Sequence, residues 1–330
     1  MFELYKYLEY NHLFGTLLTI TVSLVKMRSI SLAGVFHSLI CFTSATLIHR
    51  QSIATKFATV GGWIENIVVR PNGNLLATRL DTPELWTVDI KTREASKLIS
   101  FSDSLALTGI YEATPDVYAV VAGNFNTTTG DTGAGSYKFH WIDLTGPAPV
   151  IKNTTSFPLG EFLIGITPFN RWSFLVADAG RGAIYACGND RPWGFYANTT
   201  TDPRAAKGSS VNKGIHGLKF RYPYAYFTNT FDGTFARVSV NGTYGVADKA
   251  VEPIVTKGLP DPEDFVLLED ESALVATNSD GVYRVSKEGV LNKVVDVEKA
   301  SSVAFGRTEG DKDVLYISTR SGDIFAAKRP

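Results

Sequence analysis

Three side chains that could bind a metal ion or move a proton occupy similar places in the sequence: Glu65, His216 and Asp264. Each lies shortly before an apolar run, such as Ile-Val-Val or Phe-Val-Leu-Leu, of the kind that predicts a β-strand. If the starts of these strands meet at one axis, the three groups could hold a divalent cation or polarise an organic ligand. The alternative interpretation is that polar residues at these positions only line a wet channel.

A repeat that begins past residue 55 would supply the strands that position these residues. In each copy an apolar strand ends in small or polar residues, and a turn and a second β-rich strand follow. Successive copies are 45, 54, 51, 49 and 42 residues apart, measured between equivalent anchors. These anchors are Arg79, Asn124, Asp178, Asn229, Asn278 and Arg320. A propeller blade of four short antiparallel strands has this period. The sequence therefore predicts an all-β, six-bladed β-propeller over residues 48–330, with four-stranded antiparallel blades.

The innermost strands of such a propeller start near one face of the central channel. Aligning those starts adds Thr108, Ile164 and Ser302 to the three residues above. We expect Thr108, Ser302 and the anchor Asn229 to border a ligand pocket at this face. The segment Lys56–Gly61 has no blade of its own, and we expect it to supply the outer strand of the last blade and close the ring.

Aromatic side chains in turns or at strand ends could line a pocket for a large apolar ligand. They are Trp63, Phe125, Trp193, Phe195 and Tyr196. Each could instead pack between blades, because aromatic residues dominate such interfaces. The pair Asp261 and Glu263 is interpreted as part of a solvated turn.

Residues 1–47 differ from the rest of the chain and contain two apolar runs, Leu13–Val25 and Ile30–Leu47. The second run is typical of a secretory signal with a cleavage site near Ala45, and we expect translation to start at Met27. A membrane anchor is the alternative, but neither run reaches about 20 uninterrupted apolar residues. The cleaved chain is expected in the secretory pathway or outside the cell, without stable insertion in a membrane.

Composition agrees with export and argues against one class of partner. Four Asn-X-Thr sequons are possible glycosylation sites: Asn126, Asn153, Asn198 and Asn241. Cys41 falls in the signal, so Cys187 is left as a single thiol that cannot form an intrachain disulfide. A net charge of −1 at pH 7 gives no field that would attract nucleic acid.

Three segments resemble the senescence-marker-protein/gluconolactonase family of propellers, in particular its fungal, secretion-routed branch. They are WIENIVVRPNGNLLATRLDTPELWTVD at 63–89, GIHGLKFRYPYAYFTNTFDGTFARVSVNG at 214–242 and LPDPEDFVLLEDESALVATN at 259–278. In that family a Glu, an Asn and an Asp on inner strands bind a divalent metal that activates water for lactone hydrolysis. The resemblance implies these roles for Glu65 and Asp264, while His216 stands where the family has Asn. An imidazole suits calcium poorly, although zinc could tolerate it.

This departure favours a second function that the resemblance implies. The fungal branch resembles hetero-Diels–Alderases that join a tropolone-derived quinone methide to a humulene-type sesquiterpene without metal chemistry. We therefore expect a pericyclic cyclase that uses Glu65, His216 and Asp264, takes apolar small molecules as substrates and needs no cofactor. The alternatives are a lactonase with calcium or zinc held by the same trio, and a non-catalytic propeller that binds small molecules. The sequence leaves the oligomeric state open.

Overall fold

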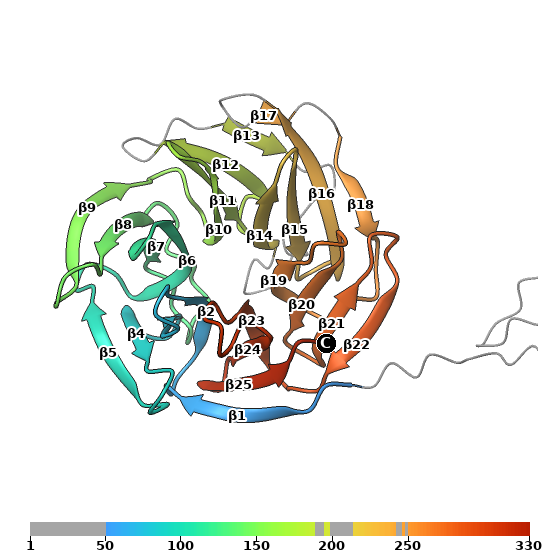
Figure 1. The fold of residues 1–330 in the computed structure, drawn as a ribbon. Coiled ribbons are helices and arrows are strands. Elements are labelled where there is room, and N and C mark those ends of the chain that lie inside the picture. Colours follow the sequence, from blue (N-terminus) through green and yellow to red (C-terminus); the bar gives the residue numbers. More distant parts are fainter. Residues whose placement is uncertain (1–50, 189–194, 199–213, 242–245, 248–249) are drawn as a thin grey trace, which may run out of the picture. The chain divides into compact units, whose positions relative to one another are not determined.

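Six antiparallel sheets follow one another along the chain in a computed structural model that describes residues 51–188, 195–198, 214–241, 246–247 and 250–330. Residues Ile48–Pro330 form one compact unit. Its sheets are arranged as blades around a central axis (Figure 1). The predicted six-bladed propeller is thereby confirmed. The proposed signal, with Met27 and Ala45, lies outside the described residues.

Consecutive strands build each blade from the axis outwards. Blade one comprises β2 (Ile64–Val69), β3 (Leu75–Arg79), β4 (Glu84–Val88) and β5 (Ala95–Ser100), and blade two comprises β6 (Ala106–Thr114), β7 (Val117–Gly123), β8 (Lys138–Asp143) and β9 (Val150–Ser156). Blade three comprises β10 (Leu163–Asn170), β11 (Ser173–Asp178), β12 (Ala183–Gly188) and β13 (Phe195–Asn198), and blade four comprises β14 (Ile215–Arg221), β15 (Tyr224–Asn229), β16 (Thr234–Asn241), β17 (Val246–Ala247) and β18 (Glu252–Val255). Blade five comprises β19 (Pro262–Leu267), β20 (Ala273–Thr277), β21 (Gly281–Val285) and β22 (Leu291–Val295).

The sixth blade joins the two ends of the propeller. It comprises β23 (Ala300–Phe305), β24 (Val314–Thr319), β25 (Asp323–Lys328) and, as its outer strand, β1 (Ala54–Thr59). Strand β1 lies beside β25 at the foot of the ring in Figure 1. The two strands pair antiparallel, from Ala54 opposite Ala327 to Thr59 opposite Asp323. The predicted closure by the segment near residue 56 is confirmed, and it covers an edge that could otherwise pair with another chain.

Burial decreases from the axis to the rim of the blades. Every residue of β11 and β12 is buried, whereas almost every residue of the outer strand β9 is exposed. The buried strands are near-continuous apolar runs because both of their faces pack against neighbouring blades. Among the described residues, no helix is long and apolar enough to span a membrane.

A β-bulge interrupts the pairing of every inner strand with its neighbour. The ladder shifts register between Ile64 and Asn66, Leu107 and Ile110, Leu163 and Ile166, Ile215 and Leu218, Pro262 and Phe265, and Ala300 and Ser302. A bulge places an extra residue in one strand and re-aims its side chain. In each inner strand one residue directly follows the pair that precedes the register shift. In blade order these residues are Glu65, Thr108, Ile164, His216, Glu263 and Ser301.

Two of these equivalences differ from the predicted alignment of inner-strand starts. In blades five and six the equivalent residues are Glu263 and Ser301, one position before the predicted Asp264 and Ser302. Because side chains alternate along a strand, a slip of one residue exchanges the side chains that face a given site. The bulges therefore decide which residues meet at the axis.

Candidate functional site

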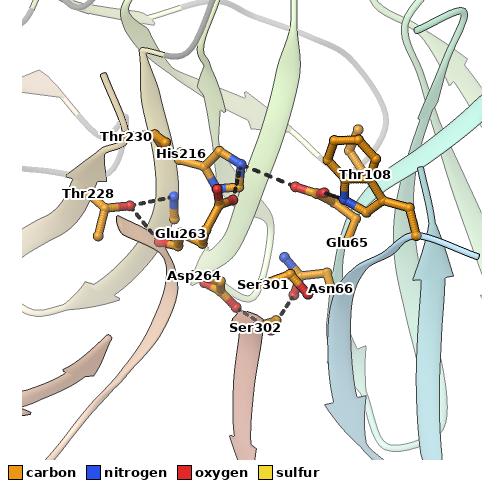
Figure 2. Close-up of polar contacts among 12 residues, drawn as sticks. Glu65, Asn66, Thr108, His216, Thr228, Thr230, Glu263, Asp264, Ser301 and Ser302 are labelled. Carbon is orange, nitrogen blue, oxygen red and sulfur yellow. Dashed lines mark hydrogen bonds and ion pairs between the residues drawn. The ribbon is translucent and has the colours of Figure 1, made fainter. Parts of the chain in front are cut away.

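His216 lies between two glutamates where the inner strands of blades one, four and five begin (Figure 2). Its Nε2 atom is 2.9 Å from Glu263 Oε2 and 3.2 Å from Glu65 Oε1. All three side chains are buried. Both contacts of the imidazole with described residues involve Nε2, so Nδ1 is left for a ligand. We call Glu65, His216 and Glu263 the axial triad.

The carboxylates hold a proton on His216. Burial lowers the pKa of the imidazole, but the nearby carboxylates of Glu263 and Glu65 outweigh it and raise that pKa to about 10. An imidazolium donates through both ring nitrogens and accepts through neither. His216 is therefore a hydrogen-bond donor at neutral pH.

Trp63 fixes the orientation of the Glu65 carboxylate. The indole Nε1–H of Trp63 donates to Glu65 Oε2 at 3.0 Å. The other oxygen, Oε1, is buried and lacks a hydrogen bond of good geometry despite its closeness to His216. A buried oxygen without such a bond is costly to leave unsatisfied, so it is a natural acceptor for a ligand or a counter-ion.

Neighbouring backbone groups set the spacing of the triad. The Thr228 hydroxyl accepts from the amide of Gly217 at 2.8 Å and donates to the carbonyl of Glu263 at 2.7 Å. This bond ties the bulge of blade four to that of blade five. Gly217 is required at its position because a Cβ there would lie 2.6 Å from the Glu263 carbonyl oxygen.

Asp264 does not converge with Glu65 and His216, contrary to the prediction. Its Oδ1 pairs with Lys219 Nζ at 2.6 Å, and its Oδ2 accepts from the Ser302 hydroxyl at 2.9 Å. Ser302 in turn lies 3.4 Å from Asn66 Oδ1 (Figure 2). Asp264 and Lys219 also border an open cavity of about 430 Å³ lined by later residues of the inner strands. Asp264 therefore belongs to a separate polar chain whose charge Lys219 neutralises.

Glu263 is the functional candidate that the sequence analysis missed. The sequence predicts a solvated turn at this position, but only 4% of the surface of Glu263 is exposed and it contacts His216. The spacing to the apolar run that follows could have identified it. That run begins two positions later in each case, as Ile67 follows Glu65 and Phe265 follows Glu263.

The other predicted pocket residues are mostly structural where the structure describes them. The buried Thr108 hydroxyl donates to the Leu163 carbonyl at 2.9 Å. Asn229 is buried and bonds through both its amide nitrogen and its oxygen to Asp232. Phe125 is buried and stacks on Phe162 with ring centres 4.8 Å apart. Trp193 and the side chains of Phe195 and Tyr196 lie outside the described residues.

The predicted sequons can be placed for two of the four asparagines. Asn153 is exposed on the outer strand β9. Asn126 is half-buried, and its side-chain oxygen accepts from the amides of Thr128 and Thr129. Of the two, Asn153 presents the more accessible amide. The side chains of Asn198 and Asn241 are not among those described.

The axial triad has donors suited to a divalent cation. One imidazole nitrogen and two carboxylate oxygens, from Glu65, His216 and Glu263, all lie within 4.8 Å of one another. Nitrogen and carboxylate oxygen are ligands that zinc takes in proteins. A cation would displace the proton on His216, so its affinity would increase with pH. The predicted trio with Asp264 fits a cation less well, because the Lys219 ammonium occupies that carboxylate.

Comparison with curated proteins finds similarity along most of the chain. It is 28% identical over 299 residues to a Phoma sp. protein named "Putative hetero-Diels-Alderase", which covers 78% of this chain and 83% of that one. It is 26% identical over 310 residues to the Sarocladium schorii protein named "Putative hetero-Diels-Alderase asR5", over 78% and 75% of the two chains. No protein-family model matches the chain.

Solved structures share the fold at low identity. A luciferin-regenerating enzyme matches with a TM-score of 0.60 and 13% identity, over 84% of this chain and 95% of its own. The major Malassezia sympodialis allergen Mala s 1 gives 0.61 and 13%, over 82% and 94%. The calcium-binding protein regucalcin from Agrobacterium tumefaciens gives 0.57 and 12%, over 84% and 95%. These neighbours support the propeller fold and carry no argument about activity.

Proposed function

We propose that this protein is an enzyme of fungal secondary metabolism that catalyses a hetero-Diels–Alder cycloaddition in the mouth of the propeller. The partners would be a reactive quinone methide of the tropolone type and a terpene alkene. Similarity over 78% of the chain to two proteins named as hetero-Diels-Alderases carries the proposal. The protonated His216 supplies the chemical feature that such a reaction needs.

The reaction requires positioning and polarisation but no nucleophile. The O=C–C=C unit of the quinone methide and the alkene form one C–C and one C–O bond, two π bonds are consumed, and no atom leaves. Holding both partners in a reactive orientation can supply several kcal/mol of the barrier. A hydrogen bond from His216 Nδ1–H to the carbonyl oxygen would draw electrons from the heterodiene as negative charge develops there. Glu65 and Glu263 keep that donor protonated.

The proposal is tested by measuring the coupling of a quinone methide, generated in solution, with humulene. The protein should accelerate formation of the cycloadduct above the background rate and impose one stereochemistry. Replacement His216→Gln should lower the rate by about 10²-fold, as loss of one oriented donor typically does. His140→Gln is the matched control, because His140 is a buried histidine on β8, the third strand of blade two, and not on an inner strand that carries the triad. An unchanged rate in His216→Gln would contradict the role given to the imidazolium.

A metal-dependent lactonase is the second candidate, and the donor set of the axial triad favours it. Glu65, His216 and Glu263 would hold the cation, which would polarise a lactone carbonyl or lower the pKa of bound water. Metal analysis of the purified protein distinguishes the two functions. Stoichiometric zinc or calcium in the purified protein and hydrolysis of lactones, with both properties lost in Glu263→Gln, would show that the protein is a hydrolase. That result would contradict the cycloaddition. Cycloaddition that is insensitive to a chelator would exclude the hydrolase.

A further inference from the structure

Arg320 lies close to the axial triad and has no counter-ion among the residues that the structure describes. It follows β24, whose last residue Thr319 pairs with Ala300 at the start of an inner strand, so it lies at the same end of the blades as the triad. The Arg320 amide donates to the carbonyl of Lys299 at 2.9 Å, which fixes the turn. Among the described residues its guanidinium contacts only the ring of Trp63.

Some other arginines of the propeller pair with carboxylates. Arg70 pairs with Asp116 at 2.9 Å, and Arg79 pairs with Asp81 at 2.6 Å. A guanidinium carries five N–H donors in a planar fork, and most are used when the residue has a structural role. The N–H donors of Arg320 have no acceptor within the described part of the chain, so this side chain can receive a ligand close to the triad.

Stacking on Trp63 gives the guanidinium a fixed place. The Cζ atom of Arg320 lies 3.5 Å from the centre of the Trp63 ring, a close cation–π contact. The same indole donates to Glu65. A continuous row of side chains therefore leads from the half-buried Arg320 through Trp63 to Glu65 of the buried triad.

The charged groups of this row predict the kind of ligand. The triad contains two carboxylates, Glu65 and Glu263, which disfavour an anionic group beside them. Arg320 lies over the face of the indole whose Nε1 edge contacts Glu65, and its guanidinium attracts an anionic group. A ligand with an acidic oxygen at one end would therefore be oriented, with that oxygen at Arg320 and its uncharged part towards His216.

We propose that Arg320 binds the acidic oxygens of a conjugated, planar substrate, such as the ionised hydroxy-ketone of a tropolone ring. Two adjacent oxygens of this kind match the guanidinium fork, which binds planar anions in a bidentate manner. The inference rests on the proposed cycloaddition for the identity of the substrate. Binding of an anion at Arg320 can nevertheless be measured separately from the reaction.

Binding of tropolone, measured by titration calorimetry, tests the inference without requiring turnover. The neutral methyl ether of tropolone serves as the uncharged probe. Arg320→Gln should weaken tropolone binding about ten- to a hundredfold, the range expected for a lost charge-assisted hydrogen bond, and leave binding of the ether unchanged. Arg320→Lys should retain part of the affinity because it keeps the charge but not the fork. Arg329→Gln is the matched control, since Arg329 also lies over an aromatic ring, that of Phe305, at 4.6 Å.

The outcomes separate this inference from the proposed function. Equal tropolone affinity in the unaltered protein and Arg320→Gln, no tropolone binding at all, or equal weakening of tropolone and its ether would overturn the role of Arg320. A protein that binds tropolone through Arg320 but does not accelerate the coupling would refute only the cycloaddition.

Discussion

At the scale of single residues, one buried proton organises the site. His216 lies within 3.2 Å of two glutamate oxygens, and all three side chains are buried. Removing one partner of a buried, paired charge usually costs about 3–5 kcal/mol, because the other charge is left uncompensated. The triad therefore depends on each member for its stability as well as for the donor it presents.

The proton on His216 predicts how stability changes with pH. The pKa of His216 is about 10 in the folded protein and near 6.5 when unfolded, so the folded state binds the extra proton between these values. Its contribution is fully present below pH 6.5 and is lost as pH rises through 10. The free energy of unfolding, measured by urea denaturation at pH 6, 8 and 10, should fall by an amount on the order of a few kcal/mol more in the wild type than in His216→Gln.

His140→Gln provides the control for this measurement. Burial lowers the pKa of His140, with Asp103 opposing, so this histidine is neutral in both states above pH 7. Its replacement should leave the alkaline loss of stability as in the wild type. Parallel curves for the wild type and His216→Gln would show that the triad does not hold a proton.

At the scale of elements, the inner-strand bulges pack one blade against the next. A Cβ on Gly165 would lie 2.2 Å from the carbonyl oxygen of His216 and 2.9 Å from the amide nitrogen of Leu218, both backbone atoms of blade four. Glycine lets the bulge of blade three approach this closely. The position of His216 therefore depends on a residue that has no side chain and takes no part in chemistry.

Substitution Gly165→Ala should move His216 and weaken the propeller. We expect a loss of about 1–3 kcal/mol in the free energy of unfolding, typical of overpacking, together with slower cycloaddition. Gly146→Ala is the matched control, because the nearest atom to its Cβ would be 4.0 Å away, and its effect should stay within about 0.5 kcal/mol. Thermal unfolding and rate measurements on both variants check this. Unaltered activity and stability in Gly165→Ala would mean that the blades can separate without consequence for the site.

The bulges also explain what the sequence could and could not predict. Strand composition and the repeat were sufficient for the six blades and for the closing strand, because burial and turn chemistry are local signals. Glu65 and His216 were found because each is followed by an uncharged residue, Asn66 or Gly217, and then by an apolar run. Glu263 was not, because Asp264 follows it directly and only the register of the β19–β20 ladder decides between the two. That register depends on packing against blades four and six.

At the scale of the whole molecule, the ring holds the triad because its ends are joined. The triad takes residues from blades one, four and five, and blade six lies between blades five and one. Blade six receives its outer strand from the start of the propeller, and β2 of blade one contacts β23 of blade six. Weakening β1 should therefore act on both stability and the site, although β1 contributes no residue to it.

Substitution Ala58→Asp tests this closure. Ala58 is 6% exposed and packs in the hydrophobic cluster that joins β1 to blades one and six, so a carboxylate there would be buried without a partner. We expect a loss of about 2–4 kcal/mol in the free energy of unfolding and slower cycloaddition. Thr55→Asp, at an exposed position of the same strand, should change stability by less than about 0.5 kcal/mol. If Ala58→Asp unfolds in one transition with normal cycloaddition before it, the ring tolerates a loosened closure. If activity disappears at a lower urea concentration than the bulk of the β-structure, the closing strand controls the geometry of the site directly.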